Sequence, residues 1–423
     1  LPDGAVPPAT SIEPPAEQPD TPAPATSAPA PTTTVDPGPE MIVQVRAHRQ
    51  LTNRGAVARV LDDSPGPVTD ILEFELADVG RYDESTGERR IVLDVPITSG
   101  AADVDQLDLL GPGVYPVTIQ IRRDAALVSQ HTTFVEVTDT AGVGRGPFRF
   151  SILVGIDDPG PDPLPTELSA ARDDLSQIAD LAGSTAAPIA LAIPPDLLQT
   201  VLRSDEQLAD RLAATLDAND GFVSLPEHML DPSAAADAEL AGEFEARLER
   251  GETTLANLFP IQPVTRSGWL TDDLLTAPGA ELLRDLDIPL LVVPWDRYLT
   301  YDGNVGNLTD TSLLLSAALP DGSAQRMMIV DQITELLDPD HDSGHAPVED
   351  AVRLMATAGA MRYQLDPDLR TMVLTTDQFS TPDPEVLSYI EQFVEEHPDF
   401  SFQPLDRVAD ITNSFFVDGN AVT

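Results

Sequence analysis

The sequence predicts a multidomain protein in which an all-β, immunoglobulin-like sandwich precedes a larger α/β domain that is (β/α)-barrel-like. Two patterns predict these domains. Residues 40–140 alternate apolar and polar side chains with a period of two, whereas residues 148–412 alternate apolar runs with helical patterns. The first pattern is typical of half-buried strands, and the second is typical of βα units around a parallel sheet.

Composition limits the classes of function. The chain has 423 residues and a formal net charge of −47, from 24 basic and 71 acidic side chains, and every basic residue is Arg. This charge repels DNA, RNA and anionic lipid, so we expect no nucleic-acid partner. The sequence has no Cys, which excludes disulfides, thiolate catalysis and Cys-ligated metals.

The first 39 residues are predicted to be a disordered stalk. They consist mainly of Pro, Ala, Thr and Ser, which bury little surface and favour extended conformations. Such tracts are typical spacers at a cell surface, with an unselected terminus as the alternative. No stretch approaches the roughly 18 apolar residues of a membrane helix. We therefore expect an exported, extracellular or cell-surface protein whose signal peptide has been removed, with any membrane anchor beyond Thr423.

The predicted sandwich consists of short strands separated by turn signals. Val43, Val45 and Ala47 share one face of the first strand, and similar alternation marks 72–76, 91–97, 117–121 and 132–137. We expect no helix of useful length here. The segment offers no cluster of acids, His or Ser that suggests chemistry, so we interpret it as a structural or docking module.

The predicted barrel begins with an apolar run at 148–156. Further runs lie at 188–193, 221–226, 288–294, 326–330 and 371–376, with weaker candidates at 253–259 and 400–405. Continuous hydrophobicity indicates strands buried on both faces. Helices are expected at 168–182, 208–216 and 386–394, the last with Asp383 as N-cap and Pro384 as first residue. Six to eight βα units suit a complete or distorted barrel, with an open doubly wound sheet as the alternative. Residues 413–423 are a predicted tail.

Polar side chains follow nearly every predicted strand. Parallel sheets gather such positions at one edge, where active sites form. Paired acids there could act as acid and base on a carbohydrate, and the candidate catalytic residues are Asp157, Glu227, Asp296 and Asp377. The candidate substrate-binding residues are Asp196, Trp295, Arg297 and Gln378. In an acid-rich chain, chance and helix capping by Asp are the alternative explanation.

The segment "SILVGIDDPGP" (151–161) resembles the first motif of polysaccharide deacetylases of the carbohydrate-esterase type. The resemblance implies that Asp157 is the base and that Asp158 is a metal ligand. The family's next motif supplies two His ligands, whereas "SLPEHMLDPS" (224–233) contains only His228, with Asp231 as a replacement ligand. We therefore expect no cofactor, and a divalent metal such as Zn²⁺ bound by Asp158, His228 and Asp231 stays the alternative.

A longer span resembles a group of secreted envelope proteins of actinobacteria. These combine a "GVYP"-containing β-domain with a degenerate deacetylase-like or glycosidase-like barrel. The matching stretches are "GPGVYPVTIQIR", "PIALAIPPDLL", "VSLPEHMLDPSAAADAEL" and "DLRTMVLTTDQFSTPDPEVLSYI". The resemblance implies a protein of the cell envelope.

Two other features complete the sequence-based prediction. His341 and His345 lie among acids in a Gly- and Pro-flanked segment, which we interpret as a solvated loop, and Trp269 is interpreted as core. There is no G-x-S-x-G elbow, P-loop or G-x-G-x-x-G motif, which excludes serine hydrolases, NTPases and Rossmann dehydrogenases.

The predicted function is that of a non-catalytic envelope protein whose degenerate barrel binds a partner. That partner is a cell-wall polysaccharide or another envelope protein. The alternative is an active carbohydrate enzyme, either a metal-dependent polysaccharide deacetylase or a glycoside hydrolase, that uses the acids at the strand ends.

Overall fold

The computed structural model describes residues 41–83, 88–98, 106–138, 147–160, 162–271, 275–301, 310–339, 341, 344–364, 369–376, 379–410 and 414–417. The predicted stalk and most of the predicted tail lie outside these residues. So do two of the candidate site residues, Asp377 and Gln378.

The N-terminal part is built on an antiparallel sheet of four strands. In order across the sheet these are β2 (Val68–Glu75), β1 (Met41–His48), β7 (Gly113–Arg123) and β8 (Ala126–Val137). Val45 and Ala47 lie on the buried face with Leu72, Tyr115 and Val117, as period-two alternation predicts. The Tyr115 hydroxyl donates a hydrogen bond to the carbonyl of Gly111 (2.8 Å) and so fixes the entry to β7.

Short elements flank this sheet. They are α2 (Leu76–Val79), β3 (Gly80–Asp83), β4 (Glu88–Ile91), β5 (Ile97–Thr98) and β6 (Leu107–Asp108). β3 pairs with β4, and β5 pairs with β6. Two separate short strands, β4 and β5, therefore stand where one strand was predicted at 91–97, and that prediction is wrong. The described residues contain no second broad sheet facing the first, and the immunoglobulin-like sandwich stays a prediction.

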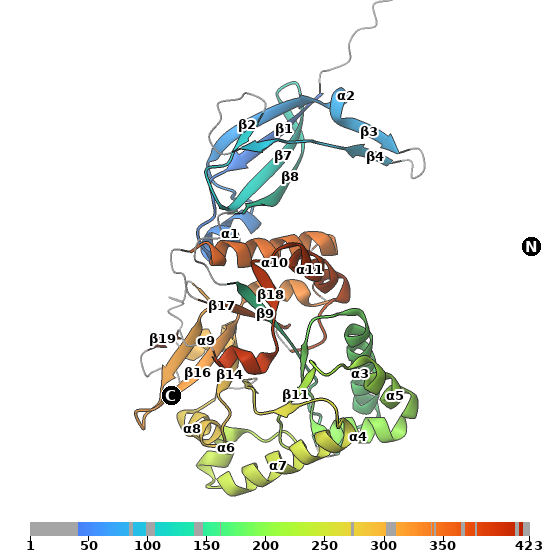
Figure 1. Ribbon diagram of the computed structural model, residues 1–423, viewed down its shortest axis with the longest axis vertical. Helices are drawn as coiled ribbons and strands as arrows, with labels where there is room; N and C mark the ends of the chain where they lie inside the picture. Colours follow the sequence, from blue (N-terminus) through green and yellow to red (C-terminus); the bar gives the residue numbers. More distant parts are fainter. Residues whose placement is uncertain are drawn as a thin grey trace, which may run out of the picture. The chain divides into compact units, whose positions relative to one another are not determined.

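Helix α1 (Arg54–Leu61) follows β1, and the expectation of no useful helix here is wrong. Asn53 caps it, since the Asn53 side chain accepts a hydrogen bond from the N–H of Ala56 (2.9 Å). Val57 and Val60 of α1 pack against α10 (Pro347–Arg362), and the two helices lie side by side in Figure 1. A two-turn helix with a distant packing partner gives a weak signal in the sequence.

The second part contains two sheets that are mostly parallel (Figure 1). The first runs β12 (Val264–Thr265), β11 (Gly221–Val223), β10 (Ile189–Ala192), β9 (Phe148–Gly155) and β17 (Arg370–Leu374), and β18 (Phe400–Phe402) also pairs with β9. The second runs β13 (Trp269–Leu270), β14 (Leu290–Pro294), β16 (Ala324–Val330), β15 (Leu314–Ala318) and β19 (Ser414–Val417).

The two sheets follow one another in the strand order of a barrel. β13 comes directly after β12 in the chain, and β16 lies beside β17. β15 is antiparallel to β16, whereas the other strand pairs of the two sheets are parallel among the described residues. The predicted α/β class with parallel strands is therefore confirmed, and the closed barrel stays a prediction.

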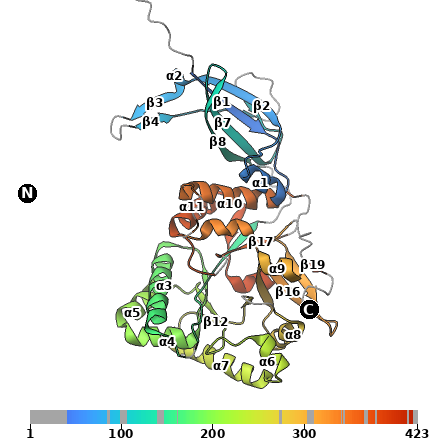
Figure 2. The same cartoon turned by 180° about the vertical axis from the view of Figure 1, so that it is seen from behind.

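Helices cover the strands, and α3, α4 and α5 lie together on one side (Figure 2). The helical segments are α3 (Pro165–Ser184), α4 (Pro195–Ser204), α5 (Glu206–Thr215), α6 (Pro232–Asp237), α7 (Ala241–Leu258), α8 (Ala277–Asp285), α9 (Trp295–Tyr301), α11 (Pro384–Glu396), and the 3-10 helices η1 (Gln332–Leu337) and η2 (Leu405–Asp410). Asp383 caps α11 as predicted, whereas the strand expected at 253–259 is wrong because that segment belongs to α7. Among the described residues, none of the helices combines the length and the apolar character needed to cross a bilayer.

Alternate residues of the first sheet's strands enter two different cores. Leu153, Val223 and Val373 of the first sheet meet Leu291 and Met328 of the second sheet in one buried cluster. Their neighbours along the strands, such as Ile152, Phe222 and Met372, pack instead against the helices. Trp269 is 3% exposed in the cluster between the sheets, so its interpretation as core is confirmed.

Candidate functional site

The segment after β9 is tied to the segment after β11 by Asp158. Its carboxylate accepts a hydrogen bond from the backbone N–H of Met229 (2.7 Å) and another from that of Gly160 (2.8 Å). β10 lies between β9 and β11, so this contact spans a neighbouring strand. Asp158 thus holds two strand ends together.

His228 pairs with Asp196 in the same cluster. The His228 Nε2 lies 2.9 Å from Oδ2 of Asp196, and both side chains are partly exposed. The backbone N–H of Asp196 donates to the carbonyl of Glu227 (3.1 Å). The ends of β9, β10 and β11 therefore bring Asp158, Asp196 and His228 together, as the barrel interpretation predicts. We call Asp158, Asp196, Glu227 and His228 the strand-end cluster.

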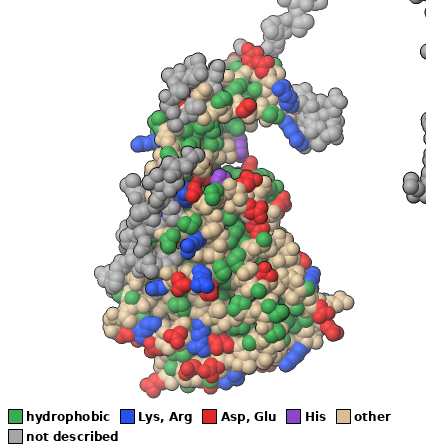
Figure 3. All heavy atoms as spheres, viewed as in Figure 1, with side chains coloured by type: hydrophobic (Ala, Val, Ile, Leu, Met, Phe, Trp, Pro, Cys, Tyr) green, Lys and Arg blue, Asp and Glu red, His purple; other side chains and the backbone are tan. Residues whose placement is uncertain are grey.

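Glu227 lies at the edge of this cluster and points to α7. Arg250 donates two hydrogen bonds to its carboxylate, of 2.8 and 2.9 Å. The hydrogen bond and charge of Arg250 hold the pKa of Glu227 below its ordinary value. Glu227 is consequently ionised near neutrality, which does not suit a general acid. Figure 3 shows acidic and Arg side chains intermixed at the end of the molecule where α7 lies.

Asp231 and Asp157 have other surroundings. Asp231 caps α6, where its carboxylate accepts from the N–H groups of Ser233 (2.8 Å) and Ala234 (3.2 Å). Asp157 is exposed. Burial of the Asp174 carboxyl on α3, with the charges of Asp173 and Asp157 beside it, raises the pKa of Asp174.

The three candidate metal ligands each contact other protein groups in this arrangement. Both oxygens of Asp158 accept backbone hydrogen bonds, both oxygens of Asp231 cap a helix, and His228 Nε2 pairs with Asp196. Within the part of the chain that the structure describes, no three His, Asp or Glu side chains converge as a metal site requires. The metal assignment stays a prediction of the resemblance.

A second cluster lies at the ends of β14 and β16. Trp295 follows β14, and the Arg54 guanidinium of α1 lies 4.4 Å from the centroid of the Trp295 ring. Arg54 Nε also lies 2.7 Å from Oδ2 of Asp331, which follows β16 and is 2% exposed. The N-terminal part thus contributes a cation to the end of the barrel strands, stacked on the indole expected to bind a sugar.

Asp296 and Arg297 are the remaining described candidates. Both lie in α9, where Arg297 Nε is 3.9 Å from Oδ2 of Asp296, and the Asp296 side chain is 75% exposed. Among the described residues, neither forms a hydrogen bond or ion pair with any of the other candidates. Asp377 and Gln378 lie outside the described residues.

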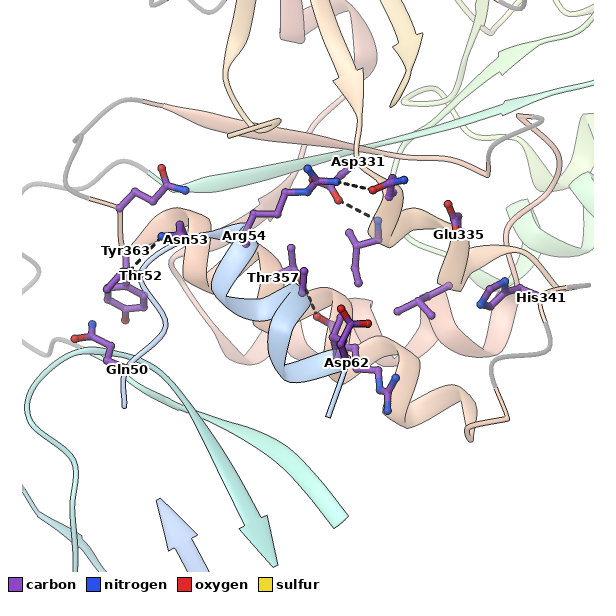
Figure 4. Close-up of a pocket in the computed structure, with 18 residues that line it drawn as sticks. Gln50, Thr52, Asn53, Arg54, Asp62, Asp331, Glu335, His341, Thr357 and Tyr363 are labelled. Atoms are coloured by element: carbon purple, nitrogen blue, oxygen red, sulfur yellow. Dashed lines mark hydrogen bonds and ion pairs between the residues drawn. The ribbon is translucent and has the colours of Figure 1, made fainter. Parts of the chain in front are cut away.

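A large cleft adjoins the second cluster, with Arg54 and Asp331 at its border (Figure 4). Its volume is about 1380 Å³. One wall comes from the turn before α1 and from α1, and the other comes from η1 and α10. Polar side chains that line it are Gln50, Asn53, Arg54, Asp62, Asp331, Gln332, Glu335, His341, Arg353, Thr357, Tyr363 and Gln364. The cleft therefore offers donors and acceptors on both walls.

Sequence reasoning did not place Arg54 or Asp174 at a site. Arg54 belongs to a helix that was not predicted, so its approach to Asp331 carried no local signal. Asp174 lies within α3 and not at a strand end. A helix-face pattern with an acid beside the buried Leu175 was the one signal available for it.

Solved structures similar to this chain include carbohydrate-active enzymes. A Mycobacterium smegmatis protein described as a polysaccharide deacetylase is 15% identical, over 65% of this chain and 92% of its own, with a TM-score of 0.40. The 4-alpha-glucanotransferase of Thermococcus litoralis is 13% identical, over 65% of this chain and 42% of its own, with a TM-score of 0.45. An alpha-mannosidase from Enterococcus faecalis is 9% identical, over 64% of this chain and 30% of its own, with a TM-score of 0.43.

No family model matches the sequence. No curated protein matches it either. At the identities and TM-scores of the solved structures, no property of those proteins carries over to this chain.

Proposed function

We propose that the protein is exported to the cell envelope of an actinobacterium and that its barrel binds an envelope glycan without transforming it. The observation that carries the non-catalytic part is the engagement of Asp158. Each oxygen of Asp158 accepts a backbone N–H, the carboxylate of Asp231 caps α6, and His228 Nε2 pairs with Asp196, so the three candidate metal ligands are directed to separate partners and not to one ion. Asp158 therefore serves to join two strand ends.

The other candidate residues support the same proposal. The pKa of Glu227 is lowered by Arg250, so Glu227 does not retain the proton that a general acid donates. The described strand ends still present an imidazole, carboxylates, an indole and a guanidinium. Such groups bind sugar hydroxyls and stack on sugar rings, and the net charge of −47 disfavours polyanions.

A paired binding and turnover experiment tests the proposal. The purified protein is applied to an array of bacterial cell-wall glycans, and acetate release from N-acetylglucosamine oligomers is measured with and without added Zn²⁺. We expect glycan binding, no acetate release, and no change in unfolding temperature on adding Zn²⁺. The matched variant is Asp158→Asn, which keeps the shape of the side chain.

Two results would contradict the proposal in different ways. Zn²⁺-dependent acetate release that is lost in Asp158→Asn would identify an active deacetylase. Binding to an envelope protein, with no glycan retained on the array, would leave an envelope role but replace the glycan with a protein partner.

A further inference from the structure

The cleft between α1 and the η1–α10 wall has features of a binding site of its own. The predicted site lay at the strand ends, and the strand-end cluster contributes no residue to this cleft. Its volume of about 1380 Å³ exceeds the range of about 300–1,000 Å³ that is typical of small-molecule pockets. An extended ligand fits such a volume better than a single small metabolite.

The lining defines the chemistry of that ligand. The side chains include amides, hydroxyls, and charges of both signs, among them Arg54, Arg353, Asp62 and Glu335. A polyanion would meet carboxylates, and a hydrocarbon chain would meet unmatched polar groups. A neutral chain of hydroxyl groups can donate to the acids and accept from the guanidiniums and amides.

Two donors in the cleft have no protein partner among the described residues. The Gln364 Nε2 is buried and makes no hydrogen bond there, which is uncommon for a buried polar atom. The Arg353 guanidinium, on α10, forms no ion pair within the described part of the chain. By contrast, Arg54 is held by Asp331 and Gln332.

We propose that this cleft binds an uncharged oligosaccharide of several sugar residues, with Arg353 and Gln364 as donors to its oxygens. The proposal rests on the proposed function, since it names the place and the charge class of the glycan. It moves the binding site from the strand-end cluster to the junction with α1.

Trp295 provides a reporter for the test. The chain contains two Trp, and Trp269 is buried in the core. In a Trp269→Phe background the fluorescence therefore comes from Trp295, which lies under Arg54 at the border of the cleft. The probes are tetramers of N-acetylglucosamine, glucose and galacturonate, and the affinity of each is also measured by calorimetry.

We expect a neutral tetramer to bind and the galacturonate tetramer not to bind. Arg353→Ala and, separately, Gln364→Ala should weaken binding, with about a tenfold loss for the charged donor. Arg59→Ala, at an exposed residue of α1 that does not line the cleft, is the matched control and should bind as the parent does. His228→Ala tests the strand-end cluster separately. Unfolding temperatures of all variants show whether each is folded.

The failures are distinguishable. If glycan binding is lost in His228→Ala and retained in both cleft variants, the cleft is not the glycan-binding site. The proposed function would still hold in that case. Preference for galacturonate overturns the neutral class of ligand. Absence of binding to every tetramer and to the cell-wall array overturns the proposed function and this proposal together.

Discussion

Arg54 Nε lies 2.7 Å from Oδ2 of Asp331, and this ion pair joins α1 of the N-terminal part to the end of the barrel strand β16. Asp331 is 2% exposed, and it also accepts hydrogen bonds from the hydroxyl of Thr311 and the N–H of Ile333. The pair is thus largely shielded from solvent. We therefore expect the pair to couple the stability of the two parts of Met41–Thr423.

Replacing Arg54 with Ala should destabilise the protein by about 3 kcal/mol, because the buried Asp331 charge loses its cation. Urea denaturation measures the change. Arg59→Ala is the control, since Arg59 is an exposed residue of the same helix. Equal stability of the two variants would show that the ion pair does not couple the parts.

Replacing Gly251 with Ala should destabilise the fold by about 2 kcal/mol, the typical cost of overpacking. Gly251 lies in α7, and a Cβ there would overlap the carbonyl oxygen of Leu225, just before Glu227 and His228. Gly242→Ala in the same helix meets no atom within 4 Å. That control should gain stability, by up to about 1 kcal/mol from helix propensity. A higher unfolding temperature in both variants would contradict the close approach of Gly251 to the carbonyl of Leu225.

Glu136 should make stability depend on pH. Burial raises the pKa of the Glu136 carboxyl above its ordinary value of 4.5, although the Tyr363 hydrogen bond and the charges of His397 and Arg362 lower it. The contribution of Glu136 to stability is therefore full below pH 4.5 and is lost as the pH rises through the raised pKa. Denaturation of the protein and of Glu136→Gln, from pH 4.5 to neutrality, measures it. The parent should lose stability relative to Glu136→Gln with rising pH, and a constant difference would contradict the assignment.

Substitutions at Gly359 and Val114 should have coupled effects on stability. A Cβ at Gly359 of α10 would lie 2.7 Å from Val114 Cγ2 of β7, so Gly359→Ala should push the helix away from the sheet. Val114→Ala removes the obstructing methyl groups, and in that background Gly359→Ala should cost less. A double-mutant cycle should give a coupling of about 1 kcal/mol or more. Additive effects on stability would indicate that a Cβ at position 359 of α10 fits beside Val114 without displacing the helix.

Local patterns in the sequence predicted much of the barrel. The apolar runs became β9, β10, β14, β16 and β17, and the apolar stripe of α3 and the cap of α11 lie where predicted. These predictions are confirmed because side-chain periodicity and capping are properties of residues that are close in the sequence. The strand predicted from the weak apolar run at 253–259 is wrong, because its apolar residues, such as Leu255, face the core from a helix.

The candidate site was less predictable. Strand ends after β9, β10 and β11 were expected to meet, and Asp158, Asp196 and His228 do lie together. The sequence could not show that Asp158 would accept backbone N–H groups or that Asp231 would cap a helix. The identity of an acidic residue does not determine whether its carboxylate binds backbone N–H groups or a ligand. The contact of Arg54 with Trp295 depends on tertiary packing alone.

The pairing of β18 with the start of β9 bears on the order of folding. Phe400 and Phe402 pair with Phe148 and Phe150, at the end of β9 that β10 does not reach. During synthesis β18 leaves the ribosome after every other strand of that sheet. The edge of β9 therefore has unpaired backbone groups until β18 has been synthesised, and chaperones that bind nascent chains would find an accessible strand there.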